Sequence, residues 1–272
     1  MAEIVIEAGH SERQYWKDLW RYRELFWFLA WRDVLVRYKQ TVIGIAWSVI
    51  RPLLTMIVFT IIFGRLAGFP SGGAPYPILV FAAMLPWQLF SNALAESSNS
   101  LVVNATMLSK VYFPRLIVPT SAVIVSLIDF LISLGIMAAL MLWYGFIPGH
   151  RMIVLPLFLL LVVAVALGLG TWTAALNVKY RDFRYIVPFL VQFGLYISPV
   201  GFSSSVIPDH WRLVYCLNPM VGAIDGFRWA ILGGDTQLYP PGLGLSVTLA
   251  MLILWLGLRY FRKTERTFAD VI

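Results

Sequence analysis

Six long apolar runs constrain this 272-residue chain more than any other feature of its sequence. A membrane helix needs about 20 apolar residues, and a soluble core could not hide this much apolar surface, so several runs must face lipid. Apolar residues make up 60% of the chain and charged residues 13%, against about 45–50% and about 25% in soluble domains. Disorder, a disulfide scaffold and a free-standing nucleic-acid binder are thereby excluded. The predicted spans lie near residues 44–66, 77–99, 117–146, 152–176, 186–206 and 242–261.

Lysines and arginines are distributed unevenly between these runs. Most of the 21 lie before the first run, in the loops after the second and fourth runs, or after the last run. By the positive-inside rule these segments are cytoplasmic, and both termini face the cytoplasm. The net charge of +7 therefore indicates topology, and we expect no nucleic-acid partner.

Two further segments are apolar but do not have the pattern of ordinary spans. Residues 15–40 carry tryptophans at helical spacing beside lysines and arginines, which is typical of a helix lying on an anionic membrane surface. Residues 207–232 are broken by prolines, and Asn218-Pro219 is a good helix start, so two short re-entrant helices are expected there. The sequence predicts one membrane domain over 15–262, with polar cytoplasmic tails at 1–14 and 263–272.

Small residues recur within the fourth run. Gly168 and Gly170 lie among several alanines in small-xxx-small patterns, which permit close contact between membrane helices. We expect these glycines to serve internal packing rather than substrate contact.

The sequence lacks the motifs of several common enzyme classes. No glycine is followed by lysine, which excludes a phosphate-cradling loop of the Gly-Lys-Ser/Thr type. The three histidines are isolated and no acidic pair accompanies them, so a metal site is not expected. No Gly-x-Ser-x-Gly pattern is present for a nucleophilic serine. We therefore expect a chain that is not an enzyme and that has no nucleotide site.

Ionisable residues within the spans also indicate function. Placing a charged side chain at the centre of a membrane helix costs about 2.5–3.5 kcal/mol, so such residues are expected to have a role that offsets this cost. Glu96 precedes the polar run Ser97–Ser100, which suggests a wet surface near the cytoplasmic side. Asp129 is either a proton or ion site of a secondary transporter or a polar contact between helices. Asp225 and Arg228 are three residues apart in the second short helix, so they can pair on one face.

Six short stretches of the chain resemble, in the expected order, type-2 ABC exporter permeases for polysaccharides and polyol phosphates. In the N-terminal half they are Arg37–Trp47 (RYKQTVIGIAW), Leu85–Asn92 (LPWQLFSN) and Lys110–Arg115 (KVYFPR). In the C-terminal half they are Tyr180–Arg184 (YRDFR), Ser198–Val200 (SPV) and Asn218–Arg228, which begins with Asn-Pro and ends with Gly-Phe-Arg. The resemblance covers roughly residues 20–265.

This resemblance implies an all-α protein of the bacterial inner membrane that exports a lipid-linked surface polymer, such as O antigen, capsular polysaccharide or teichoic acid. It also implies a homodimer with two copies of a separate ATPase, which would hold ATP and Mg while this chain binds no cofactor. Closure of that ATPase must reach the membrane through short cytoplasmic elements. The first candidate is the loop of residues 104–115, the interfacial helix is the second, and the segment around Arg181 is the third. Within the loop the coupling candidates are Lys110, Val111, Tyr112, Phe113 and Arg115, although these cations could instead only set topology.

Three groups of residues are candidates for contact with the polymer and its lipid phosphate. Arg37, Lys39 and Arg51 are candidate phosphate acceptors at the inner mouth, the alternative for Arg51 being a side chain that reaches up to the interface. Sugars stack on aromatic faces, so rings in the spans either line a channel or pack between helices. These rings are Trp47, Trp87, Phe90, Trp172 and Tyr196. The candidate outer gate consists of Asn218, Pro219, Asp225 and Arg228 in the short helices.

Two rival functions stay open at this point. An ABC exporter of a drug or small lipid would share the predicted topology. A proton-coupled secondary transporter would depend on Asp129 and would need no ATPase.

Overall fold

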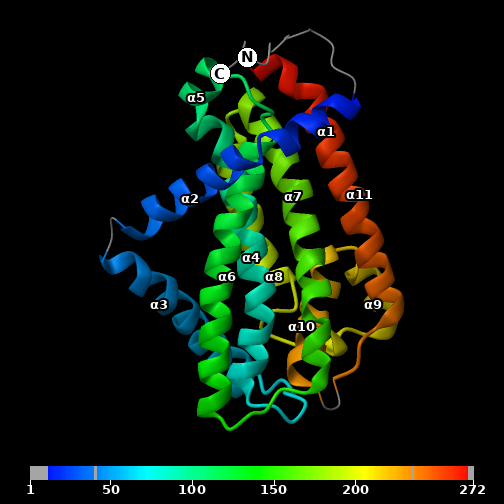
Figure 1. The fold of residues 1–272 in the computed structure, drawn as a ribbon. Coiled ribbons are helices and arrows are strands. Elements are labelled where there is room, and N and C mark those ends of the chain that lie inside the picture. The colour runs from blue at the N-terminus through cyan, green and yellow to red at the C-terminus, as the bar shows by residue number, and fades with distance from the viewer. Residues whose placement is uncertain (1–11, 40–41, 234–235, 269–272) are drawn as a thin grey trace.

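The chain is all-helical over the residues that its computed structural model describes, 12–39, 42–233 and 236–268 (Figure 1). This part of the chain contains no strand. Five of its helical stretches are long and apolar enough to cross a membrane, which agrees with the predicted all-α membrane protein. Their bounds are Ala46–Leu66, Tyr76–Val103, Ile117–Trp143, His150–Lys179 and Pro240–Thr267.

The long stretches are built from five helices with short helical extensions. Helix α3 (Val42–Phe59) continues into a π-helical turn, Thr60–Leu66. Helices α4 (Tyr76–Val103) and α6 (Ile117–Trp143) are uninterrupted. A 3-10 turn, His150–Val154, leads into α7 (Leu155–Lys179), and α11 (Pro240–Thr264) ends in another, Glu265–Thr267.

The fifth predicted span is shorter than the sequence suggested. Helix α8 begins at Phe183 and ends at Ile197, 15 residues in all, whereas the prediction was 186–206. The helix ends because Ser198-Pro199 begins a turn, in which the Val200 amide donates to the Ser198 carbonyl at 2.7 Å. At about 1.5 Å per residue α8 is about 22 Å long, below the roughly 30 Å of a hydrocarbon core. Five long helices and one short apolar helix thus take the place of six full spans.

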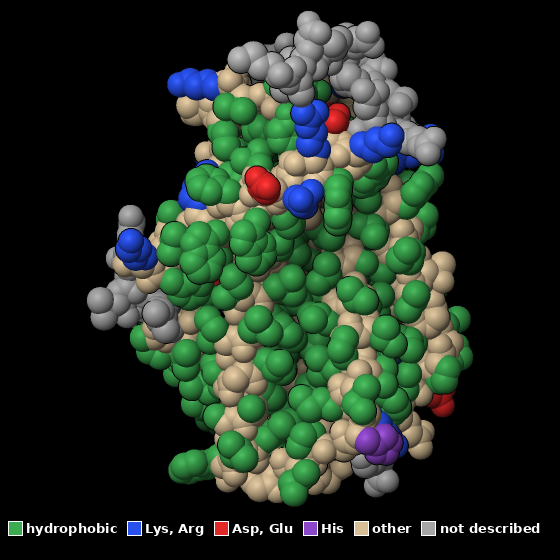
Figure 2. All heavy atoms as spheres, viewed as in Figure 1, with side chains coloured by type: hydrophobic (Ala, Val, Ile, Leu, Met, Phe, Trp, Pro, Cys, Tyr) green, Lys and Arg blue, Asp and Glu red, His purple; other side chains and the backbone are tan. Residues whose placement is uncertain are grey.

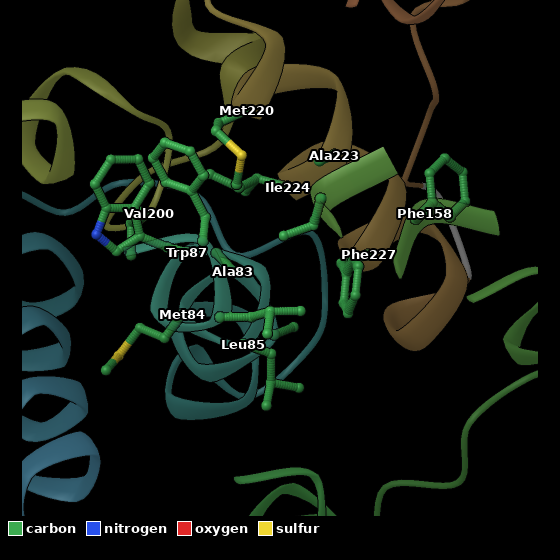
Figure 3. Packing of buried hydrophobic residues seen from close by; sticks show 14 of the residues in the cluster. Ala83, Met84, Leu85, Trp87, Phe158, Val200, Met220, Ala223, Ile224 and Phe227 are labelled. Atoms are coloured by element: carbon green, nitrogen blue, oxygen red, sulfur yellow. The ribbon is translucent and has the colours of Figure 1, made fainter. Parts of the chain in front are cut away.

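Helix α4 forms the centre of the bundle, and α6, α7 and α10 pack directly on it. In its most apolar stretch 78% of the residues are buried, compared with 17% in Ala46–Leu66. Figure 3 shows Ala83 and Trp87 of α4 close to Val200 and to residues of α10. Helix α3 instead stands away from the bundle in Figure 1, so most of its apolar surface is not covered by this chain.

Helices α7 and α11 touch through glycine, which explains their close approach. A Cβ at Gly257 would lie 2.1 Å from the Gly168 carbonyl oxygen, and one at Gly168 would lie 2.7 Å from the Leu254 Cα. A Cβ at Gly170 would lie 2.8 Å from the Cβ of Ser97 in α4. A larger residue at any of these positions requires a neighbour to move. The predicted small-residue packing of the fourth run is confirmed, and its partners are α11 and α4.

The broken segment before the last long helix forms two short helices, α9 (Asp209–Tyr215) and α10 (Pro219–Leu232), after a 3-10 turn at Ser204–Val206. The predicted helix start at Asn218-Pro219 is confirmed, because the Asn218 side chain accepts a hydrogen bond from the Met220 amide at 3.0 Å. Most of α10 is buried against α4, α7 and α11.

The N-terminal segment contains two helices, α1 (Glu12–Arg21) and α2 (Arg23–Lys39), where one helix over 15–40 was expected. The break falls at Tyr22, and side chains on both sides of it, Leu19 and Phe26 among them, pack against the same group of buried residues. The tryptophans of both helices are exposed. Figure 2 shows lysines and arginines gathered around this end of the molecule, while hydrophobic side chains cover the middle of the visible face.

Candidate functional site

A second hydrophobic core, here called the end core, lies at the end of the bundle beside α1 and α2. It is separate from the main core around α4 and draws residues from α2, α4, the segment between α4 and α6, α6, α7, α11 and the residues after α11. The end core therefore joins all three predicted coupling elements, or their immediate neighbours, in one packed unit. Its buried members are Leu29, Leu101, Leu108, Phe113, Leu116, Ile117, Val118, Ala174, Ala175, Val178, Phe261 and Phe268.

The predicted coupling segment, residues 104–115, contains the short helix α5 (Ala105–Lys110) and an extended stretch after it. Val111 and Tyr112 are 56% and 58% exposed, and Lys110 is exposed beside them. Phe113 is buried in the end core. The three apolar coupling candidates thus divide into an exposed tip, Val111 and Tyr112, and an internal anchor, Phe113.

Both ends of the coupling segment are held by polar contacts. At its start, Arg32 of α2 donates to the Asn104 side-chain oxygen at 2.9 Å, while also pairing with Asp33. At its end, Arg115 donates to the Glu265 backbone carbonyl, and its guanidinium lies 5.9 Å from the Phe268 ring centroid. Arg115, predicted to face an ATPase, is thus directed inward.

The C-terminal segment Glu265–Phe268 was predicted to belong to a polar tail, and its part in this region was missed. The Tyr15 hydroxyl of α1 donates to the Glu265 carboxylate at 2.9 Å, and Arg262 lies over the Tyr15 ring at 3.7 Å. Burial, followed by the neighbouring Glu265, raises the pKa of Tyr15, so its hydroxyl remains protonated and able to donate. The signal in the sequence was one aromatic residue, Phe268, among polar neighbours.

A charged cluster joins α2 to α4 and α6. Arg37 donates to Asp129 at 2.6 Å and to Glu96, and the Tyr38 hydroxyl donates to Asp129. Within the described part of the chain, both ion pairs that join α2 to other helices come from Arg37. Asp129 is the more enclosed acid, with 17% of its side chain exposed against 48% for Glu96. This is the polar contact between helices that the sequence offered as the alternative for Asp129.

The serines after Glu96 do not form the wet surface that the sequence suggested. Ser97, Ser98 and Ser100 are buried. Ser97 donates to the Pro119 carbonyl of α6 at 2.8 Å, and Asn177 of α7 donates to the Ser98 carbonyl at 3.0 Å. The Ser100 hydroxyl donates to the Ser97 carbonyl of the same helix at 2.7 Å, so the run is tied to α6, to α7 and to its own backbone.

The remaining predicted cations differ from Arg37 in their surroundings. Lys39, Arg51 and Arg181 are exposed. Arg51 lies in α3, one residue before the buried Pro52. These side chains are therefore accessible at the surface, whereas Arg37 and Arg115 are engaged in contacts between helices.

The predicted channel aromatics fall into two groups. Trp87 and Phe90 are buried with their ring centroids 5.4 Å apart, and Trp172 lies against Tyr260 at 6.2 Å, so these rings serve helix packing. Trp47 and Tyr196 are exposed. The sequence prediction missed further exposed rings on α8 at helical spacing from Tyr196, namely Tyr185, Phe189 and Phe193.

The predicted pairing of Asp225 with Arg228 is wrong, because each side chain bonds other groups. Within the described residues these two side chains form no ion pair, and Asp225 interacts with Ser204 instead. The buried Arg228 donates to the carbonyls of Leu79, Val200 and Phe202 at 3.3, 2.9 and 2.6 Å. It bonds there because Val200 and Phe202 follow the end of α8, where carbonyls have no helical partner.

The turn after α8 is also held by other predicted gate residues and by α4. The Asn218 side chain donates to the Ser198 hydroxyl at 3.0 Å, and the Tyr76 hydroxyl donates to the Gly201 carbonyl at 2.8 Å. Asn218 and Arg228, together with Tyr76, thus fix the connection between α8 and the short helices.

The described part of the chain contains no cluster of side chains suited to bind a metal ion. No group of three or more histidine, cysteine, aspartate or glutamate side chains is placed there to hold a metal ion. Cys216 is buried and is not part of a disulfide.

Comparison with known proteins agrees with a bundle of long apolar helices. The family model for ABC-2 type transporters matches residues 24–232. The chain is 28% identical over 260 residues to the O-antigen export system permease protein RfbA of Myxococcus xanthus, covering 94% of this chain and 98% of that protein. A Klebsiella pneumoniae protein of the same name is 26% identical over 89% of this chain and 92% of its own length. The polysialic acid transport protein KpsM of Escherichia coli is 22% identical over 86% and 91%.

Proposed function

The chain belongs to the ABC-2 type transporter family, and on this premise we propose that it is the permease subunit of an ATP-driven exporter of a lipid-linked surface polysaccharide. The observation that carries the proposal is its similarity to O-antigen export permeases over nearly the full length of both chains. The polymer is O antigen or capsular polysaccharide, with teichoic acid as a further option. The site of action is the bacterial inner membrane.

In the proposed topology the chain crosses the membrane six times with both termini in the cytoplasm. The five long helices supply five crossings, and α8 with the turn after it supplies the sixth. The concentration of lysines and arginines near α1 and α2 supports a cytoplasmic location for that end. Helices α9 and α10 then re-enter from the outer side, where the rest of the bundle covers α10.

The proposed assembly contains two copies of this chain and two copies of a separate ATPase, which holds ATP and Mg. Helices α3 and α8 carry large exposed apolar side chains, which give a second copy and the surrounding lipid a surface to contact. The ATPase would dock at the exposed tip of the coupling segment, Val111 and Tyr112, beside Lys110. Arg181 lies exposed in the connection between α7 and α8 and is a further docking candidate.

For the lipid phosphate of the substrate, the accessible cations Arg51 and Lys39 are the better acceptors. Arg37 is held by two carboxylates, which would have to be displaced before it could bind another anion. For the sugar chain, the exposed rings Trp47 and Tyr196 offer stacking surfaces that require no fixed hydrogen bonds. The buried rings Trp87 and Phe90 would contribute through packing. The turn fixed by Asn218 and Arg228 would close the outer mouth.

Deletion of the gene tests the proposal directly. We expect one surface polysaccharide to disappear from the cell exterior and its lipid-linked form to accumulate inside. Unchanged surface polymers would refute the proposal and would favour an exporter of a drug or small lipid.

Variants expressed in the deletion strain also distinguish ATP-driven export from proton-coupled secondary transport. We expect Asp129→Asn to restore export at least in part, and a hydrolysis-deficient partner ATPase to abolish it. Export that survives without ATP hydrolysis and requires the Asp129 carboxylate would instead support proton coupling.

A further inference from the structure

The coupling segment can pass a displacement from the ATPase to the helices only if its own position in the permease is fixed. Its tip at Val111 and Tyr112 is exposed, while Leu108 and Phe113 of the segment are buried in the end core. A force on this exposed tip moves the membrane helices only if neighbouring residues hold the rest of the coupling segment in place. The contacts that hold its end come from the C-terminal segment Glu265–Phe268.

Phe268 connects this segment to α11. Its side chain is 1% exposed, and its ring meets that of Phe261 edge to face with centroids 5.5 Å apart. The 3-10 turn Glu265–Thr267 continues directly from α11 and leads to Phe268, which lies in the end core together with Phe261.

Glu265 makes two contacts that face different elements. Its backbone carbonyl accepts from Arg115 at the end of the coupling segment, and its carboxylate accepts from Tyr15 of α1 at 2.9 Å. The guanidinium of Arg262 is also 3.3 Å from this carboxylate. One residue therefore links the coupling segment, the N-terminal helix and α11.

We propose that Glu265 and Phe268 are positioning residues for energy coupling, because they fix the coupling segment against α1 and α11. A displacement of Tyr112 would then pass to both helices rather than be lost in local movement of the loop. This inference rests on the proposed function for its consequence in transport, while its structural part applies to the permease alone.

The structural part is tested with a spin label on the permease in lipid bilayers. The label is attached to Val111→Cys, with Cys216→Ser to leave one thiol. We expect Phe268→Ala to shorten the rotational correlation time of the label by about twofold, because the segment loses its anchor. Phe158→Ala is the matched control, since Phe158 is a buried phenylalanine of the main core, far from this segment in the packing. Equal mobility in both variants and the parent would overturn the inference, whatever the transport data show.

The functional part is tested in the complete complex with its ATPase, as polymer exported per ATP hydrolysed. This ratio does not depend on how much folded complex each variant yields. We expect Phe268→Ala to lower it about fivefold, Tyr15→Phe to lower it about twofold, and Phe268→Leu to keep it near the parent value because an apolar anchor remains. If Phe268→Ala exports as much polymer per ATP hydrolysed as the parent, the inference is overturned. A parent complex that exports no polymer would overturn the proposed function and leave the mobility result standing.

Discussion

Replacement of Gly257 by alanine adds one methyl group at the tightest contact between α7 and α11. The added Cβ would lie 2.1 Å from the Gly168 carbonyl oxygen, and 2.8 Å from the carbonyl carbon of the same residue. Both atoms belong to the backbone of α7, so no side-chain rotation can relieve the overlap. The matched control is Gly244→Ala, also in α11, where an added Cβ meets nothing within 4 Å.

The expected magnitude follows from the overlap. Real Cβ atoms essentially never lie closer than 3.0 Å to another heavy atom, so the two helices must separate by about 1 Å at this crossing. Overpacking of this kind costs about 1–3 kcal/mol, while alanine in place of a helical glycine returns up to about 1 kcal/mol. We expect a net loss of about 1–2 kcal/mol for Gly257→Ala and a gain of about 0.5–1 kcal/mol for Gly244→Ala.

Thermal unfolding of both variants in the same detergent measures the difference. For a chain of this size 1 kcal/mol corresponds to about 2–4 °C in Tm, so the two midpoints should differ by about 3–12 °C, with Gly257→Ala the lower. Equal midpoints, or a higher midpoint for Gly257→Ala, would refute the assignment of this contact as backbone against backbone.

Three further changes address the other contacts. Tyr112→Asp places a charge at the exposed tip of the coupling segment, and we expect ATP hydrolysis to continue while export falls about tenfold, whereas unchanged export would contradict docking at this tip. Arg51→Ala should lower polymer-stimulated ATP hydrolysis about threefold if Arg51 receives the lipid phosphate, and stimulation equal to the parent would exclude that role. Arg228→Met leaves three carbonyls without their donor, so we expect a loss of about 3–5 kcal/mol in thermal unfolding. A midpoint within 2 °C of the parent, by the same conversion of about 2–4 °C per kcal/mol, would show that these bonds are replaced by others.

Most of the long helices could be predicted from the sequence, because hydropathy and helix-capping residues depend only on neighbouring positions in the chain. The start of α10 at Pro219 followed from one capping side chain and one proline. The length of α8 did not follow, because the apolar residues after Ile197 continue the hydropathy signal while the chain has already turned at Ser198. The break at Tyr22 was also missed, because it depends on the core against which both flanking helices pack.

Partners of charged side chains were the least predictable part of the candidate site. Spacing within one helix suggested that Arg228 would pair with Asp225, but carbonyls from a distant turn compete for the same guanidinium. Likewise, Arg37 and Asp129 are far apart in sequence, and only the packing of α2 on α6 brings them together. Contacts of this kind depend on tertiary structure, which spacing along the chain does not encode.

The burial of α4 bears on which substitutions the chain can accept. Among the five long helices α4 is the least hydropathic and the most buried, so its apolar residues are selected for shape against neighbouring helices and not for solubility in lipid. Where α3 faces lipid, and it is mostly uncovered by its own chain, its side chains need only remain apolar. In a library of single substitutions, exchanges among leucine, isoleucine, valine and phenylalanine would be tolerated along most of α3 and rejected along α4. Tolerance to such exchanges would therefore rank the helices in a different order from hydropathy.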